Sequence, residues 1–110
     1  MSVLYVQVIY IRVLYTRLSQ VMHWATLYRM TSLRIGFGRA VARLRRAAGF
    51  SQEAFALSCK VHRTYMTGIE RGKHNVSLDI LERIAKGLRV DTGQLMAEAE
   101  KERRSSSARG

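Results

Sequence analysis

The 110-residue chain contains no proline, one cysteine and few acidic residues. Without proline, no position obliges a helix to break, which fits helices joined by short glycine-containing connections. A single cysteine, Cys59, cannot form an internal disulfide, so nothing indicates an oxidising compartment. Eight acidic against 19 basic residues leave a net charge of +11. This excess favours a polyanionic partner, either nucleic acid or an anionic membrane surface.

Catalytic patterns are also missing from the sequence. It shows no nucleophile–base pair and no glycine-rich phosphate loop, and so short a chain cannot form a deep pocket. Cys59, His62 and His74 do not have the spacing of a closed zinc site, and a fourth ligand is missing. We therefore expect neither an enzyme nor a cofactor, metal or small-molecule substrate, and we interpret Cys59 as a small buried hydrophobe.

Residues 1–33 form an apolar extension whose role stays open. The composition of Val3 to Tyr15, rich in β-branched and aromatic residues, favours strand over helix. Polar residues interrupt it too often for the ~20 apolar residues of a membrane-spanning helix. One interpretation is that translation starts at Met30. The others are an added strand or helix that contributes a dimer contact, and membrane association through tyrosines, Trp24 and arginines.

Residues 34–98 carry helical periodicity and predict five helices. The first contains Phe37, Val41 and Leu44 on one face, and the second runs from a Ser51 cap to about Cys59. A turn of about three residues leads to a third helix over 62–71. A fourth runs from a Ser77 cap to about residue 88, with Leu78, Leu81, Ile84, Ala85 and Leu88 on one face. The fifth runs from 91 or 92 to about 100. Residues 99–110 read as a polar, disordered tail.

Two short helices joined by a tight turn are the pattern of a helix-turn-helix. In the second of them, Tyr65 or Met66 and then Ile69 would face inward. Small and basic side chains would face outward: Arg63, Thr64, Thr67 and Gly68. A generic five-helix bundle with a merely solvated polar face explains the periodicity equally well.

The segment SQEAFALSCKVHRTYMTGIERGKHNVSLDILERIAKGL resembles the Cro and phage-repressor type of helix-turn-helix, also called the XRE family. The resemblance covers about residues 35–96. Within the family, RTYMTGIERGK is similar to the controller proteins of restriction–modification systems, which are small dimeric autoregulators. The resemblance implies an all-α, five-helix lambda-repressor-like DNA-binding domain. Lys60 departs from the small residue usual in the turn, which leaves the backbone conformation of that turn open.

The resemblance also implies roles for individual side chains on double-stranded DNA. Arg63, Thr64, Thr67 and Gly68 would meet base edges in the major groove, although Arg63 could instead bind a phosphate. The expected contacts to the DNA backbone come from Gln52, His62, Arg71, Lys73, His74 and Asn75. The alternative for 73–75 is a solvated turn. Glu70 would pair with Arg45 and tie the third helix to the first.

These features predict a cytoplasmic, sequence-specific transcriptional regulator, with a restriction–modification controller as the specific form. A homodimer would place two recognition helices ~34 Å apart on a palindromic operator. Val90, Leu95 and Met96 would form the dimer interface, unless Leu95 and Met96 only close the core of the monomer. The alternative function is an antitoxin that represses its own operon and also binds a toxin.

Overall fold

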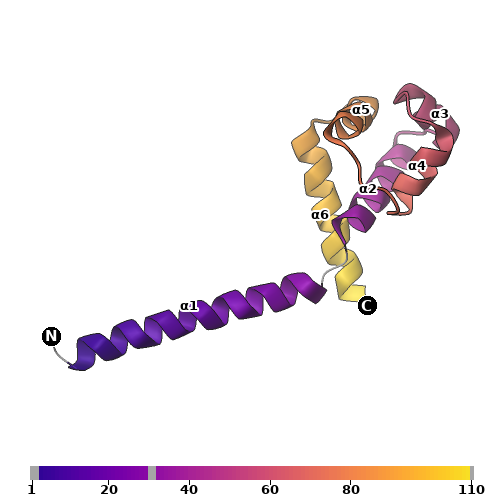
Figure 1. Ribbon diagram of the computed structural model, residues 1–110. Coiled ribbons are helices and arrows are strands. Elements are labelled where there is room, and N and C mark those ends of the chain that lie inside the picture. Colours follow the sequence, from indigo (N-terminus) through magenta and orange to yellow (C-terminus); the bar gives the residue numbers. More distant parts are fainter. Residues whose placement is uncertain (1–2, 30–31, 110) are drawn as a thin grey trace. The chain divides into compact units, whose positions relative to one another are not determined.

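The computed structural model describes residues 3–29 and 32–109, and each regular element in them is a helix (Figure 1). The helices are α1 (Val3–Arg29), α2 (Leu33–Ala47), α3 (Gln52–Ser58), α4 (Arg63–Glu70), α5 (Leu78–Leu88) and α6 (Thr92–Arg109). The chain divides into two compact units, residues 1–30 and 31–110. The predicted all-α class is confirmed, and the larger unit holds the five predicted helices.

The strand preference inferred for Val3 to Tyr15 is wrong, because these residues lie within the 27-residue helix α1. A helix satisfies its backbone hydrogen bonds within its own segment, whereas a strand needs a neighbouring strand, and the described residues contain none. No described helix is long and apolar enough to cross a membrane. Met30 and the side chain of Trp24 lie outside the described residues.

The core of the larger unit forms where α2 packs against α4, α5 and α6. Predicted core residues Phe37 and Val41 are buried, and Leu44 is half-buried. The other large core side chains are Phe55, Met66, Ile69, Ile84 and Leu95. Cys59 is also buried, as predicted, and burial raises the pKa of its thiol to about 11. On the predicted apolar face of α5, Ile84 and Ala85 are buried as predicted, but Leu78 is exposed.

The disordered tail predicted for residues 99–110 is contradicted, because α6 continues to Arg109. Ala99 is fully buried, so the packed core reaches into the residues predicted to form the tail. The Arg43 guanidinium lies 2.5 Å from the carboxylate of Glu98 and 2.7 Å from that of Glu102. The hydrogen bond from Arg43 lowers the pKa of Glu98. These polar side chains are therefore ordered by pairing with α2.

Candidate DNA interface

The helix-turn-helix consists of α3, a four-residue turn and α4, and each helix begins with an N-cap residue. The Ser51 hydroxyl accepts a hydrogen bond from the Ala54 N–H at 3.1 Å, which satisfies a free donor at the start of α3. His62 does the same for α4 through Nδ1, which accepts from the Thr64 N–H at 3.2 Å. Lys60 adopts the left-handed conformation in the turn, with φ of 57°. The turn thus keeps its shape without the small residue usual in the family.

One face of α4 is anchored in the core and leaves the start of the helix at the surface. Met66 and Ile69 are fully buried, which decides the inward face in favour of Met66 over the half-buried Tyr65. Arg63 and Thr64 are exposed on the first turn. The Arg63 side chain is 63% exposed, and its guanidinium lies 3.7 Å from the carboxylate of Glu53 on α3. An exposed ion pair of this length is weak, so Arg63 can leave it for a base or a phosphate.

Thr67 and Gly68 do not share the exposure of Arg63. The Thr67 hydroxyl is half-buried and lies 2.8 Å from Oε1 of Gln52. Gly68 is buried, and a Cβ placed there would overlap the imidazole ring of His74. The prediction that Gly68 faces a base is therefore wrong. Its missing side chain makes room for His74, not for DNA.

A buried hydrogen-bond network joins α2, α3 and α4. The Arg45 guanidinium donates to both carboxylate oxygens of Glu70 at 2.6 and 3.2 Å, and to the Phe50 carbonyl at 2.8 Å. The Arg45 and Glu70 side chains are each only 8% exposed. The Gln52 amide donates to Glu70 at 2.9 Å and accepts from Thr67. The predicted Arg45–Glu70 pair is confirmed, and the sequence did not reveal that Gln52 and Thr67 extend it.

The residues expected at the DNA backbone fall into two groups. His62, Arg71, Lys73 and Asn75 are exposed around the start and end of α4. Gln52 and His74 are half-buried and engaged within the protein. The His74 ring stacks on Tyr65, with ring centroids 4.6 Å apart and planes 10° apart. His74 is therefore held against the helix, whereas Lys73 and Asn75 stay exposed to solvent.

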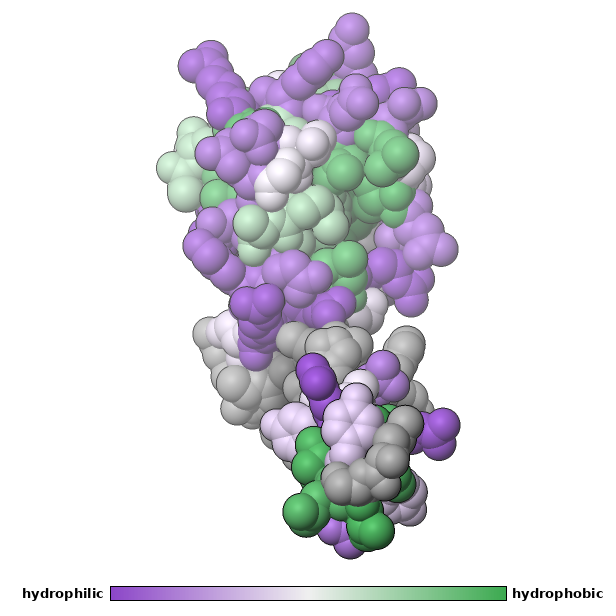
Figure 2. All heavy atoms as spheres, turned by 90° about the vertical axis from the view of Figure 1, so that its left-hand side faces the viewer, coloured by the Kyte–Doolittle hydropathy of each residue, from purple (hydrophilic) through white to green (hydrophobic). Residues whose placement is uncertain are grey.

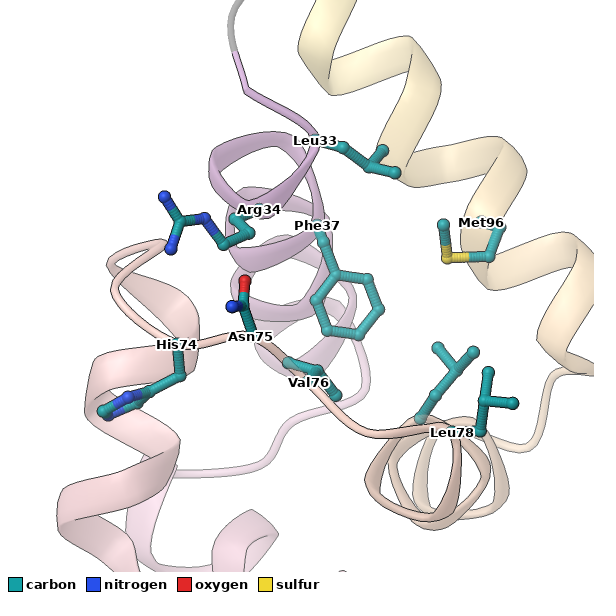
Figure 3. A pocket seen from close by; sticks show the side chains of 9 residues that line it. Leu33, Arg34, Phe37, His74, Asn75, Val76, Leu78 and Met96 are labelled. Atoms are coloured by element: carbon teal, nitrogen blue, oxygen red, sulfur yellow. The ribbon is translucent and has the colours of Figure 1, made fainter.

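Arg34 is a basic residue that the sequence analysis missed. It lies exposed in the first turn of α2 and lines the same surface hollow as His74 and Asn75 (Figure 3). In the sequence it is one of many arginines, and no spacing rule connects it to a loop some 40 residues away. The fold brings it beside the backbone-binding candidates.

The predicted dimer residues are also divided by the structure. Leu95 is fully buried within this chain, so its assignment to a dimer interface is wrong and the alternative role in the core holds for it. Val90 and Met96 are half-buried. Met96 lines a mostly apolar hollow of about 270 Å³. Its remaining lining comes from α2, α5 and the loop before α5: Leu33, Arg34, Phe37, His74, Asn75, Val76, Leu78 and Leu81 (Figure 3).

Leu78, which the helical periodicity predicts on the buried face of α5, lies at the surface instead. Its side chain is 76% exposed at the rim of the hollow. Figure 2 shows hydrophobic surface on the larger unit, framed by hydrophilic side chains. Leu78 shares the helical period of Ile84 and Ala85, but it precedes the part of α5 that the core covers.

Comparisons with known proteins agree with this geometry. A profile described as a helix-turn-helix domain matches residues 37–99, which is more than half of the chain. The chain belongs to the helix-turn-helix family. Within this family it is 44% identical to the control protein C.BamHI of Bacillus amyloliquefaciens over 66 residues, covering 59% of this chain and 82% of that protein. It is 42% identical to the control protein C.MunI of Mycoplasma sp over 74 residues, covering 66% of this chain and 100% of that one.

A solved structure of the same helix-turn-helix group contains DNA. C.Esp1396I bound to a 25 base pair operator site superposes with a TM-score of 0.59 at 32% identity. The match covers 66% of this chain and 95% of that one. C.Esp1396I is a restriction–modification controller protein. The resemblance to controller proteins inferred from the RTYMTGIERGK segment is confirmed by these matches.

Proposed function

We propose that this protein is a homodimeric regulator that binds operator DNA through α4 and controls a restriction–modification operon. The observation that carries the proposal is the first turn of α4. It presents Arg63 and Thr64 to solvent while the rest of the helix is fixed by Met66, Ile69 and the buried Glu70. Similarity to control proteins favours this function over an antitoxin.

In this function Arg63 and Thr64 read bases in the major groove. Arg63 exchanges its weak pair with Glu53 for two hydrogen bonds to guanine, worth ~1–3 kcal/mol of discrimination. The Thr64 hydroxyl and methyl suit a base edge or a thymine methyl. Thr67 acts mainly by positioning, since its hydroxyl already bonds Gln52.

Phosphate contacts would come from both ends of α4. His62 lies at its start, and Arg71, Lys73 and Asn75 lie at its end, with Arg34 beside them. Such contacts fix the register of the protein on DNA without selecting sequence.

For the homodimer we propose an interface that includes Val90, Met96 and the exposed Leu78. Leu78 and Met96 line the side of the hollow away from Arg34 and His74 (Figure 3), and there they offer hydrophobic surface that a second copy would cover. A two-fold dimer would present two α4 helices to half-sites ~34 Å apart, as a palindromic operator requires.

The test is a gel-shift titration on the DNA upstream of the gene, with unrelated DNA of the same length as competitor. We expect Arg63→Ala to weaken binding to the upstream DNA by roughly 5- to 150-fold per half-site while binding to unrelated DNA changes little. Arg104→Ala, which removes an exposed arginine from α6, is the matched control and should leave both affinities near native. The proposal fails if upstream DNA forms no specific complex, or if the two variants behave alike.

A further inference from the structure

Helix α1 lies outside the region matched to the family and takes no part in the proposed DNA contacts. Its described side chains nevertheless expose much apolar surface, visible in Figure 2. Leu4, Ile11 and Leu18 are 73%, 64% and 61% exposed. Large exposed apolar surfaces of this kind mark interaction sites.

Apolar side chains are exposed on several sides of α1, and one line of them, Leu4, Ile11 and Leu18, forms a stripe along the helix. Leu4, Ile11 and Leu18 recur every seven residues, which aligns them nearly parallel to the helix axis. Leu14 flanks this line on one side and Tyr15 on the other. The described stripe runs from position 4 to position 18. A seven-residue apolar spacing keeps one line of side chains facing a paired helix.

Polar residues occupy one flank of α1 in its second half. Arg12, Thr16 and Ser19 follow one another at intervals of three and four residues, away from the stripe. The Thr16 hydroxyl donates to the Arg12 carbonyl at 2.9 Å. Arg12 and Arg17 lie off the central line of Leu4, Ile11 and Leu18, so over residues 4–18 two copies can join along it without bringing like charges into the contact.

Gln7 favours a second copy of the helix over a lipid surface as the partner of the stripe. It lies at the edge of the stripe, between Leu4 and Ile11. Its amide carries both donors and an acceptor, so two Gln7 side chains facing each other can hydrogen-bond, whereas in lipid they would be unpaired. Only a parallel pair in register brings them together. The side of α1 opposite the stripe carries apolar residues such as Ile9 and Val13. The helix therefore lacks the broad polar face of an interfacial membrane helix.

We propose that α1 pairs with α1 of a second copy as a parallel coiled coil along Leu4, Ile11 and Leu18. This surface is separate from the one proposed for the larger unit, and the pairing does not depend on DNA binding. Joining the chains through α1 makes association of their larger units effectively intramolecular, which raises the affinity of the dimer for paired half-sites.

Cysteine cross-linking of the full chain without DNA tests the pairing. Leu4→Cys and Leu18→Cys place thiols on the stripe, and the controls Val6→Cys and Val13→Cys place them on other sides at comparable exposure. Native Cys59 is buried, so the native chain supplies the background. Under mild oxidation we expect the stripe variants to form disulfide dimers at least about ten-fold faster than the controls, because a disulfide requires close, facing Cβ atoms. Equal rates overturn the proposal. It is also overturned if Leu4→Cys forms a disulfide only with Leu18→Cys in a mixture of the two variants, because that pairing is antiparallel.

Sedimentation equilibrium gives a second, independent measurement. Ile11→Glu with Leu18→Glu should weaken self-association by about 100-fold or more, whereas Ile9→Glu with Val13→Glu should change it less than about three-fold. Flotation with phosphatidylglycerol vesicles tests the alternative that α1 binds a membrane. If both double variants lose vesicle binding equally while their self-association is unchanged, the proposal is overturned. Loss of operator specificity with cross-linking intact would contradict only the proposed DNA function.

Discussion

At the scale of single residues, Glu70 explains how an acidic side chain persists on a helix that faces a polyanion. Its carboxylate is almost fully buried and accepts from Arg45 and Gln52, so it holds α4 in place without facing DNA. Removing one partner of a buried pair leaves the other charge uncompensated.

We therefore expect Glu70→Ala to lower the free energy of unfolding by roughly 3–5 kcal/mol in urea denaturation. Glu98→Ala removes a carboxylate from the more exposed pair with Arg43 and should cost less than about 1 kcal/mol. Similar losses in the two variants would show that the Arg45–Glu70 pair contributes no more than a surface pair.

Lys60 carries backbone strain in the turn between α3 and α4. Its φ of 57° is favourable for glycine and costly for a residue with a Cβ. Lys60→Gly should raise the free energy of unfolding by about 0.5–1 kcal/mol, seen as a higher thermal midpoint.

The control is Lys86→Gly, which places glycine inside α5, where it should lower stability by about 1 kcal/mol. Opposite signs for the two substitutions are the result to look for. A loss of stability at both positions would mean that the side chain of Lys60 contributes more than its backbone strain costs.

At the scale of elements, α2 and α6 approach closely at Gly36. A Cβ added there would lie 2.6 Å from the Ala99 carbonyl oxygen and 3.0 Å from the Cβ of Arg103. Backbone atoms cannot move aside as the end of a flexible side chain can. The closeness of the two helices therefore depends on the missing side chain.

Gly36→Ala tests the close contact of α2 with α6, because helix propensity and packing predict opposite signs for the change in stability. Propensity alone would add about 1 kcal/mol of stability, whereas the clash should cost about 1–3 kcal/mol. We expect a net loss in thermal unfolding, while Gly93→Ala, in the exposed first turn of α6, should be neutral or stabilising. A gain at Gly36 would mean that α6 moves away from α2 easily.

At the scale of the whole molecule, the charge of +11 predicts strong dependence of DNA binding on salt. A dimer that makes six to ten phosphate contacts should lose roughly 10³- to 10⁵-fold in affinity between 50 and 200 mM salt. Fluorescence anisotropy with labelled unrelated DNA measures this loss.

Lys73→Ala separates the phosphate contacts from base reading. Removing one contact per chain should reduce the slope of log affinity against log salt by about two for the dimer, on specific and unrelated DNA alike. An unchanged slope would exclude Lys73 from the DNA backbone. Arg63→Ala should differ by acting mainly on the specific site.

The sequence by itself determined the features that depend on local chemistry and periodicity. Caps at Ser51 and Ser77, the burial of Ile69 and the exposure of Arg63 follow from side-chain type and helical spacing. The Arg45–Glu70 pair came from family resemblance, because the two residues lie on different helices 25 positions apart.

Only the tertiary structure decided what the outward-facing residues of α4 contact, and where the helices end. Gly68 lies under His74, and Gln52 reaches Thr67 and Glu70, because helices far apart in sequence meet there. The residues after position 98 lack apolar periodicity and so resemble a disordered tail, yet Arg43 of α2 pairs with Glu98 and Glu102 of α6. Local patterns fix which residues can form a helix, whereas long-range packing fixes what each exposed position faces.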